Sequence, residues 1–196
     1  ANQNFGILVG NFDGVHRGHQ FIISSFVECC ALHSCLPVII TFNPHPIFIK
    51  EPTTHNFLIM SYGVRNKKLE KFCNYIEVKF EEVIMNTSGL GFLKNIFELE
   101  NMRLFFAGHD FALGANKSFD FDEVKKIAPD YNVKAFQADV FVDKNAKGIS
   151  SSEVRKLIKK GDIQKANEYL GESYAVSGKI ISGKQLGRKI GFPTYN

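Results

Sequence analysis

The sequence predicts an α/β protein with a doubly wound parallel sheet, for two reasons. Short apolar segments rich in β-branched residues alternate with segments of helical periodicity along the chain. Chains that alternate strand and helix in this way build a parallel sheet covered by helices. The predicted strands are residues 5–9, 36–42, 76–80, 103–107 and 133–138. The predicted helices are residues 19–32, 64–72, 91–99, 121–128, 150–160 and 163–170.

Residues that break regular structure set the ends of several of these elements. The strand 36–42 ends at Asn43-Pro44-His45-Pro46, because proline can continue neither a helix nor a central strand. The helix 121–128 stops before Pro129 for the same reason. Gly171 is the expected stop of the last helix, because glycine readily adopts the left-handed conformation of a helix end.

The end of the chain differs in character, which predicts a division into two domains. Residues 174–181 alternate as an antiparallel strand does, and glycines punctuate the remainder. We expect a first domain over residues 1–171 and the start of a second over residues 172–196, since about 25 residues are too few for a separate core.

Composition bounds the class of protein. The 196 residues are 44% hydrophobic and 22% charged, as in soluble globular proteins, and the net charge of +4 fits an anionic substrate. A basic run interleaved with aromatic residues, which would indicate nucleic acid binding, does not stand out in this sequence. Four cysteines lack the C-x-x-C spacing, so we expect reduced thiols in a cytoplasmic protein. No apolar run is long enough to predict a membrane span, and the oligomeric state stays open.

The segment from Val9 to Gln20 indicates a chemistry. It places His16 and His19 where the first predicted strand gives way to the first predicted helix. Glycines at this junction let the backbone approach a ligand, and the free N–H groups of a helix start favour an anion. Two imidazoles add donors, so the segment predicts phosphate binding. Zinc is the weaker alternative, because a catalytic zinc needs a third protein ligand that no motif here supplies.

Further polar segments follow other strands or begin a helix. Ser150, Ser151 and Ser152 begin the helix 150–160 with Arg155 one turn on, which suits either a phosphate site or ordinary N-capping. Asp110 follows the strand 103–107, where either substrate contact or turn capping is open. Ligands of doubly wound sheets bind beyond the carboxyl ends of the strands, where these motifs fall.

Five segments together resemble the prokaryotic bifunctional FAD synthetase family (riboflavin kinase/FMN adenylyltransferase) of the nucleotidyltransferase superfamily. Residues 10–19, GNFDGVHRGH, resemble its H-x-G-H signature, and residues 41–46, TFNPHP, resemble its F-x-P-H-P segment. Residues 108–114, GHDFALG, resemble G-x-D-F-x-F-G, and residues 149–155, ISSSEVR, resemble I-S-S-T-x-x-R. Residues 187–196, GRKIGFPTYN, resemble the opening P-T-x-N motif of the kinase module.

The resemblance implies a Rossmann-like nucleotidyltransferase domain over residues 1–171, followed at 172–196 by the first strands of an incomplete β-barrel riboflavin kinase domain. It implies transfer of the adenylyl group of ATP to FMN, which gives FAD and releases pyrophosphate. Mg²⁺ would come with ATP, and protein side chains alone would hold no metal. The full-length parent would also phosphorylate riboflavin to FMN, an activity that we do not expect of residues 1–196 alone.

The resemblance also assigns site residues. The catalytic residues that it implies are His16, His19, Asp110 and Arg155. The residues implied to bind ATP are Gly10, Asn11, Phe12, Asp13, Gly14, His16, His19, Ser150, Ser151, Ser152 and Arg155. The residues implied to bind the flavin are Asn43, Pro44, His45, Pro46, Phe48 and Asp110. Thr194 and Asn196 belong to the incomplete kinase motif, where they would contact Mg-ATP in a complete module.

Four residues depart from the family pattern, and two rival functions stay open. Ser152 stands where the family has Thr, which keeps the hydroxyl. Leu113 and Phe119 stand where the family has Phe and Gly, and Gly148 stands where Arg or Lys is expected. One rival is another H-x-G-H nucleotidyltransferase, against which the P-T-x-N tail argues. The other is a nucleotide- or RNA-binding module without catalysis. FMN-dependent release of pyrophosphate from ATP separates the first hypothesis from both rivals.

Overall fold

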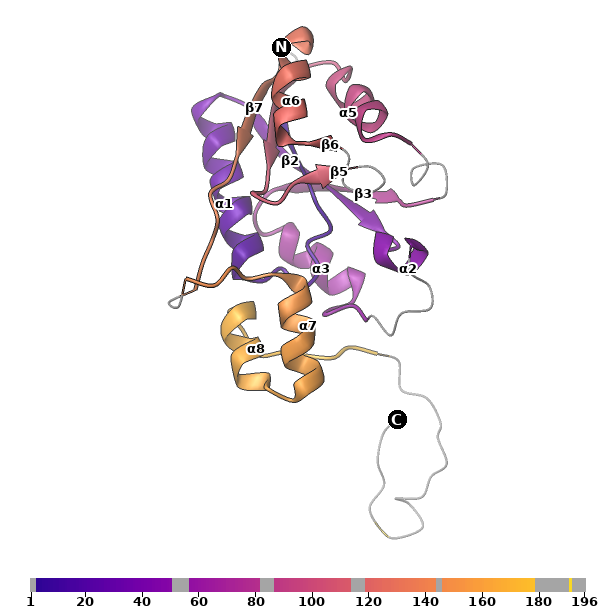
Figure 1. Cartoon of the computed structure of the whole chain (residues 1–196), viewed down its shortest axis with the longest axis vertical. Helices are drawn as coiled ribbons and strands as arrows, with labels where there is room; N and C mark the ends of the chain where they lie inside the picture. Colours follow the sequence, from indigo (N-terminus) through magenta and orange to yellow (C-terminus); the bar gives the residue numbers. More distant parts are fainter. Residues whose placement is uncertain are drawn as a thin grey trace.

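Five parallel strands form the centre of the protein, whose computed structural model describes residues 3–50, 57–81, 87–113, 119–143, 146–178 and 191 (Figure 1). The sheet order is β3-β2-β1-β4-β7, and each neighbouring pair runs parallel. The strands are β1 (Phe5–Val9), β2 (Leu36–Asn43), β3 (Asn74–Lys79), β4 (Met102–Ala107) and β7 (Lys134–Gln137). All five predicted strands are present.

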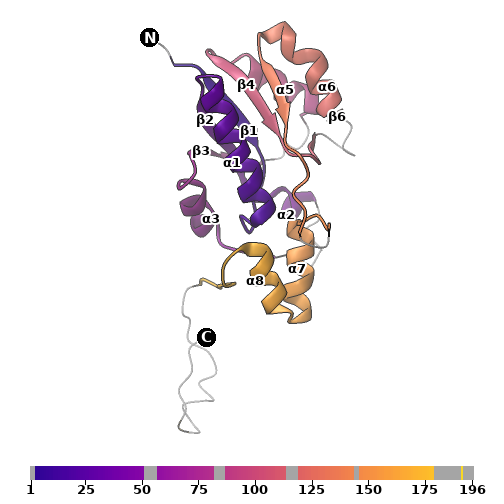
Figure 2. The same ribbon diagram turned by 90° about the vertical axis from the view of Figure 1, so that its left-hand side faces the viewer.

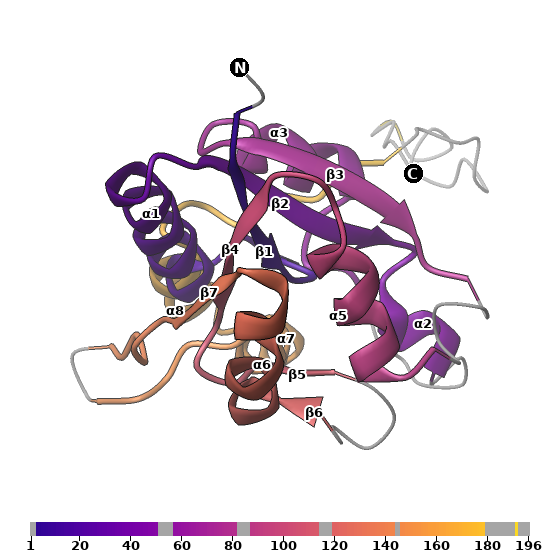
Figure 3. The same ribbon diagram turned by 90° about the horizontal axis from the view of Figure 1, so that it is seen from above.

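Helices cover both faces of this sheet, as a doubly wound architecture requires. Helices α1 (Arg17–Leu32) and α3 (Tyr62–Leu69) pack on one face, and α5 (Gly89–Phe97) and α6 (Phe121–Ile127) pack on the other (Figure 3). Each helix begins and ends within three residues of its prediction. The predicted fold class of the first domain is confirmed.

The strands are apolar on both sides because successive side chains point to opposite faces of the sheet. In β1, Ile7 and Val9 pack in the cluster that contains α5 and α6, whereas Leu8 packs in the cluster that contains α1. In β4, Phe105 and Phe106 divide between the same two clusters. Strands buried on both faces therefore appear in the sequence as uninterrupted apolar segments.

The direction of winding reverses between β1 and β4. The chain runs outward from β1 through α1 and β2 to α3 and β3, and then returns to place β4 on the other side of β1. The loops that leave β1 and β4 consequently diverge toward helices on opposite faces. A crevice forms at such a switch point, at the carboxyl ends of the strands, and it is where ligands of open α/β sheets bind.

Two further helices lie beyond the carboxyl edge of the sheet (Figure 2). Helices α7 (Ser151–Lys160) and α8 (Ile163–Leu170) contribute Val154, Tyr169 and Leu170 to a third apolar cluster. Gly161 and Gly171 end these helices with φ of +77° and +78°, so the predicted stop at Gly171 is found in the left-handed conformation, as is Gly161. The start of α7 faces the switch point.

Four short elements were not predicted. Helix α2 (Pro46–Lys50) begins at the second proline of the turn that follows β2, since a proline in the first helical turn gives up no hydrogen bond. The 3-10 helix η2 (Ala128–Tyr131) continues beyond α6 through Pro129. Strands β5 (Ala112–Leu113) and β6 (Phe119–Asp120) form an antiparallel pair in which Leu113 lies opposite Phe119, and Phe119 is buried. Leu113 and Phe119, two of the residues that depart from the family pattern, thus pack against each other.

The segment after α8 corrects one prediction and leaves another untested. Residues 174–178 are not in a strand, and their contacts are with the first domain: Tyr174 N donates to Asn167 Oδ1 at 2.7 Å and Ser177 Oγ bonds Ser61 Oγ at 3.1 Å. The rest of that predicted strand, together with Thr194 and Asn196, lies outside the described residues. A domain boundary at residues 171–172 stays a prediction. None of the helices in the described ranges has the length and apolar character that a bilayer crossing requires.

Candidate active site

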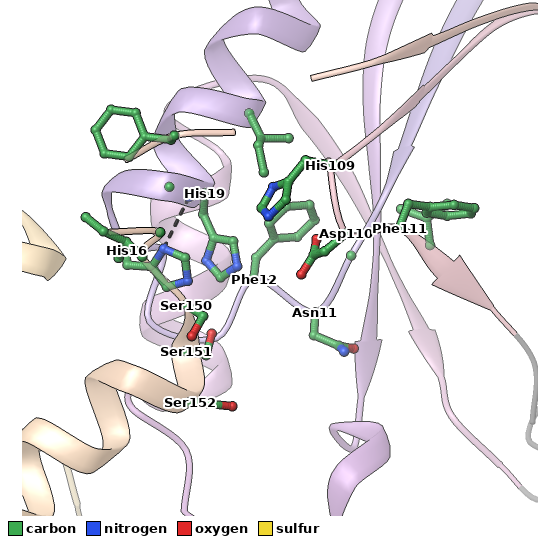
Figure 4. A pocket seen from close by; sticks show the side chains of 18 of the residues that line it. Asn11, Phe12, His16, His19, His109, Asp110, Phe111, Ser150, Ser151 and Ser152 are labelled. Carbon is green, nitrogen blue, oxygen red and sulfur yellow. Dashed lines mark hydrogen bonds between the residues drawn. The ribbon is translucent and has the colours of Figure 1, made fainter. Parts of the chain in front are cut away.

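A cavity of about 560 Å³ lies at the switch point, at the carboxyl ends of β1, β2 and β4 (Figure 4). Its wall comes from the loop after β1, the start of α1, the loops after β2 and β4, and the segment that enters α7. The candidate site residues that line it are Gly10, Asn11, Phe12, His16, His19, His45, Asp110, Ser150, Ser151, Ser152 and Arg155. Segments up to about 145 residues apart in sequence thus converge as the fold class predicts.

The two histidines of the H-x-G-H segment are buried next to each other. His16 precedes α1, where its Nδ1 accepts the backbone N–H of His19 at 3.3 Å and caps the helix. The two rings stack with centroids 3.6 Å apart, and Phe12 meets the His19 ring edge-on. Because His16 Nδ1 accepts a hydrogen bond, the neutral ring carries its proton on Nε2.

Three buried polar atoms at this cavity have no hydrogen-bond partner among the described residues: Asn11 Oδ1, His16 Nε2 and His19 Nδ1. A buried polar atom without a partner is costly, so native proteins rarely leave one unexplained. Here all three belong to one wall of one cavity. The simplest physical account is a ligand that supplies the missing partners.

Burial keeps these imidazoles uncharged near neutral pH. Desolvation, helped by the charge of Arg155, lowers the pKa of His16 to about 4. Desolvation and the neighbouring His16 lower the pKa of His19 well below its ordinary value. The pKa of His45 also falls to about 4, through burial and through the charges of Arg155 and Arg65. An anionic ligand would act in the opposite direction and favour protonation.

The loop between β1 and α1 adopts an unusual backbone. Phe12 and Val15 have φ of +50° and +37°, a region that costs energy for residues with a side chain, and Gly14 has φ of +86°. Gly18 permits a close approach instead, since a Cβ there would lie 3.0 Å from the carbonyl oxygen of Ile149. The segment that enters α7 can therefore close over the start of α1.

Asp13 and Arg155 form a buried ion pair beneath the cavity. Arg155 Nη2 lies 2.5 Å from Asp13 Oδ2, and Arg155 Nε donates to the carbonyl oxygen of Phe57 at 2.9 Å. The Asp13 carboxylate also accepts the backbone N–H of Ile59 at 3.0 Å. Burial raises the pKa of Asp13, and the Ile59 N–H and Arg155 oppose that rise. Asp13, which was expected at the nucleotide, ties the loop after β1 to α7, and Arg155 both holds this pair and lines the cavity.

The three serines differ in what their hydroxyls do. Ser150 Oγ accepts the N–H of Glu153 at 3.3 Å and so caps α7. Ser151 Oγ donates to the carbonyl oxygen of Asp13 at 2.8 Å, which fixes the helix start against the loop after β1. Ser152 is exposed on the cavity wall. This segment therefore caps α7 and lines the cavity at once, so N-capping does not exclude the predicted ligand contact.

The turn after β2 contributes less to the cavity than expected. Of the predicted flavin residues on this segment, His45 lines the wall; Ile47, which was not predicted, lines it too. Asn43 donates its amide to Glu77 at 2.9 Å, and Phe48 meets the His45 ring edge-on at 6.1 Å. Asn43, Pro44, Pro46 and Phe48, like Asp13 and Gly14, are not among the described residues that line the cavity.

Several wall residues were not among the predicted site residues. His109 and Phe111 flank Asp110 (Figure 4). Phe141 also lines the cavity, from the segment after β7. Phe141 was unpredictable because an isolated aromatic residue is more often part of a core. His109 lies within residues 108–114, which resemble a family motif. Its position directly after a strand is the signal that could have identified it as a wall residue.

The capacity of this site for a metal ion is limited. No group of three His, Cys, Asp or Glu side chains in the described ranges is arranged to hold a metal. Asp110 is the single carboxylate among the described residues that line the cavity. Mg²⁺ is commonly held by one or two carboxylates together with substrate phosphates, so these residues fit a magnesium ion that arrives with a polyphosphate.

The fold and the cavity together define an α/β protein with a phosphate-suited ligand site at the switch point of its sheet. The family model for FAD synthetase matches residues 1–153, and the model for riboflavin kinase matches residues 170–196. The chain therefore belongs to the FAD synthetase family.

Curated relatives carry the name bifunctional riboflavin kinase/FMN adenylyltransferase. That of Buchnera aphidicola subsp. Schizaphis graminum is 32% identical over 100% of this chain and 64% of its own length. That of Bacillus subtilis is 32% identical over 97% of this chain and 60% of its own length. The Escherichia coli K12 protein is 27% identical over 97% of this chain. The chain thus spans less than two thirds of the length of these relatives.

A solved structure shares the fold. The crystal structure described as a macrolide-efflux protein from Streptococcus pneumoniae superposes with a TM-score of 0.81, covering 100% of this chain and 64% of that one. Its sequence identity of 24% supports the likeness of fold alone.

Proposed function

We propose that this chain transfers the adenylyl group of ATP to FMN, giving FAD and pyrophosphate. The observation that carries the proposal is the set of three unpartnered buried atoms, Asn11 Oδ1, His16 Nε2 and His19 Nδ1, at the switch-point cavity. Membership of the FAD synthetase family and the names of the curated relatives support the same reaction.

The reaction requires the protein to align the two substrates and to stabilise charge, rather than to form a covalent bond to either of them. An oxygen of the FMN phosphate bonds to the α-phosphorus of ATP while the bond from that phosphorus to the bridging oxygen breaks, and pyrophosphate leaves. Negative charge builds on the α-phosphate and on the leaving group in the transition state. Fixed donors in a site shielded from water stabilise that charge most strongly.

His16 and His19 are the donors that we assign to the nucleotide phosphates. The proton on His16 Nε2 has no partner among the described residues, so it is available to a phosphate oxygen without breaking a bond to any of them. A phosphate beside these rings raises their pKa values again, so one or both can take up a proton when ATP binds. Ser152 and Arg155 reach the same cavity from α7 and complete the phosphate site.

The remaining assignments follow from where each group lies. Asp110 would complete the coordination of Mg²⁺ carried by the triphosphate, and the bound ion would neutralise phosphate charge. His45 and Ile47 would border the flavin from the side of β2. We also assign residues 172–196 to the start of a riboflavin kinase domain and place the protein in the cytoplasm, on its family and its reduced cysteines.

A direct assay tests the proposal. The purified chain is incubated with ATP, FMN and MgCl₂, and FAD and pyrophosphate are quantified by chromatography and a coupled assay. We expect the two products in equal amounts, and no dinucleotide when riboflavin, which lacks the attacking phosphate, replaces FMN. A folded preparation that forms no FAD under these conditions would contradict the proposed function.

A further inference from the structure

We propose that Arg65, a residue behind the cavity wall, is a positioning residue that sets the geometry of both substrate loops at once. It acts through hydrogen bonds to the backbone carbonyl oxygens of Asn11 and Phe42. What those two loops bind rests on the proposed function, whereas the network itself consists of contacts within the chain.

One guanidinium group joins the carboxyl ends of three neighbouring strands. Arg65 lies on α3 and is 2% exposed. Its Nη1 donates to Phe42 O in β2 at 2.9 Å and to Asn11 O, after β1, at 3.2 Å. Its Nη2 bonds Glu77 Oε2 in β3 at 2.6 Å. A planar fork of donors can make all three contacts simultaneously, which an ammonium on a flexible stem cannot.

The partner carboxylate extends the network to the turn after β2. Glu77 accepts the side-chain amides of Asn43 and Asn66, each at 2.9 Å. Burial acts to raise the pKa of Glu77, but these amides and the charge of Arg65 outweigh it and lower the pKa below its ordinary value. The pair is therefore ionised at neutral pH, and Asn43, the first residue of the predicted flavin segment, is held by it.

The loop after β1 depends on this contact because its own conformation is unfavourable. The Asn11 carbonyl belongs to the same peptide unit as the Phe12 nitrogen, so its orientation fixes how the chain enters Phe12, where φ is +50°. Thr41 Oγ1 donates to the same oxygen at 3.3 Å. Arg65 and Thr41 thus hold the Asn11 carbonyl from behind the cavity wall. The unpartnered Asn11 Oδ1 remains available at the cavity.

Helix α3 holds the second loop by a parallel contact. The backbone N–H of His45 donates to Tyr62 Oη at 2.7 Å. The Arg65 guanidinium carbon lies 5.0 Å from the centre of the Tyr62 ring, stacked over it, and so fixes the ring that makes this bond. His45 lines the cavity, so one side chain supports the walls for both proposed substrates.

A role in stability alone does not account for this arrangement. Buried ion pairs generally stabilise a fold no more than apolar residues of similar volume would, because desolvation offsets their attraction. An apolar side chain at position 65 would fill the same space, yet it would leave the Asn11 and Phe42 carbonyls without this donor. The distinctive contribution of Arg65 is thus the direction in which the two loops point.

The test compares Arg65→Met with a core variant of the opposite face, Leu93→Ala. Leu93 is fully buried on α5 in the cluster that excludes α3, so its truncation destabilises the fold without removing any of the hydrogen bonds of Arg65 or Glu77 described above. We expect Arg65→Met to lower kcat for FAD formation at saturating ATP and FMN on the order of 10²-fold, as misplacement of reacting groups does. We expect Leu93→Ala to lower Tm at least as much while kcat stays within about threefold of the wild type.

A partner variant and a spectroscopic readout make the test independent of folding yield and of activity. Glu77→Gln, at a half-buried position, should lower kcat less than Arg65→Met, and the double variant should be no worse than Arg65→Met alone, because both act through one network. The backbone amide resonances of Phe12 and Asn43 should shift in Arg65→Met and Glu77→Gln and stay in place in Leu93→Ala.

These outcomes separate the two proposals. Wild-type kcat in Arg65→Met, equal losses in Leu93→Ala, or additive effects in the double variant would overturn the positioning role. A wild-type chain that forms no FAD while the Phe12 and Asn43 resonances still respond to Arg65→Met would overturn the proposed function and leave the positioning of the loops standing.

Discussion

At the scale of single residues, the site is distinguished by buried polar atoms that have no hydrogen-bond partner in the part of the chain that the structure describes. His16 Nδ1 caps α1, whereas His16 Nε2 is buried and has no partner among the described residues. A surface histidine at a helix start would instead be solvated on both nitrogens. This difference separates a ligand site from incidental capping, and it could be seen only once the rings were placed.

The first prediction concerns the contribution of one imidazole to the reaction. His19→Ala should lower kcat for FAD formation roughly 10²–10³-fold, the usual cost of losing a transition-state donor. His33→Ala, at the other end of α1, is the matched control and should retain wild-type turnover. Steady-state assays with ATP and FMN measure both, and wild-type turnover in His19→Ala would refute the assigned role.

The second prediction concerns the pH dependence of stability. His16 has a folded-state pKa of about 4 against about 6.5 when unfolded, so folding favours its neutral form. Its stabilising contribution is complete above pH 6.5 and is lost as the pH falls toward 4, by on the order of 3 kcal/mol. Urea unfolding between pH 7.5 and 4.5 should show a smaller loss in His16→Gln. Identical curves for the two proteins would argue against a buried neutral His16.

At the scale of elements, the site depends on contacts between segments that follow different strands. Helix α7 is joined to the loop after β1 by the Asp13–Arg155 ion pair and by Ser151, across more than half of the chain. Asp13 was expected at the nucleotide and Arg155 as a catalytic group. Because Asp13 and Arg155 also pair with each other, a substitution of either residue affects the stability of the fold as well as the role expected at the site.

The third prediction follows from that ion pair. Arg155→Met should lower the free energy of unfolding by about 3–5 kcal/mol, because it leaves the Asp13 carboxylate buried without its cation. Adding Asp13→Asn should recover part of the loss by removing that charge. Lys156→Ala, a neighbouring exposed cation, should change stability by less than about 0.5 kcal/mol. Denaturant titrations measure all three, and no recovery in the double variant would contradict this account.

At the scale of the whole molecule, the sheet and the site form one unit, and the last described segment packs against it. Glu172 forms an ion pair with Lys68 of α3, and Ser177 contacts Ser61 just before that helix. Glu172 and Ser177 therefore pack against the first domain, while the boundary at residues 171–172 stays a prediction. This has a direct consequence for where the chain can be shortened.

The fourth prediction tests that extent. A chain of residues 1–178 should fold and form FAD with an unchanged kcat, since the cavity and its supports lie within it. A chain of residues 1–171 should keep the same kcat but unfold at a lower temperature, because it lacks the contacts of Glu172 and Ser177. Calorimetry and the FAD assay on the two truncated chains provide the comparison. Loss of turnover in the longer one would show that residues 179–196 contribute to the site.

The sequence by itself determined the class of fold and the segments that meet at its switch point. Strands buried on two faces and helices buried on one leave a periodic apolar pattern, and the recognised motifs are local runs such as residues 10–19 and 149–155. Only the tertiary structure decided which polar groups are paired and which are left for a ligand. Arg65 meets Glu77, Asp13 meets Arg155, and Phe119 meets Leu113 because strand order brings them together. No local pattern specifies such partners, since their energies depend on burial and on distances that the fold creates.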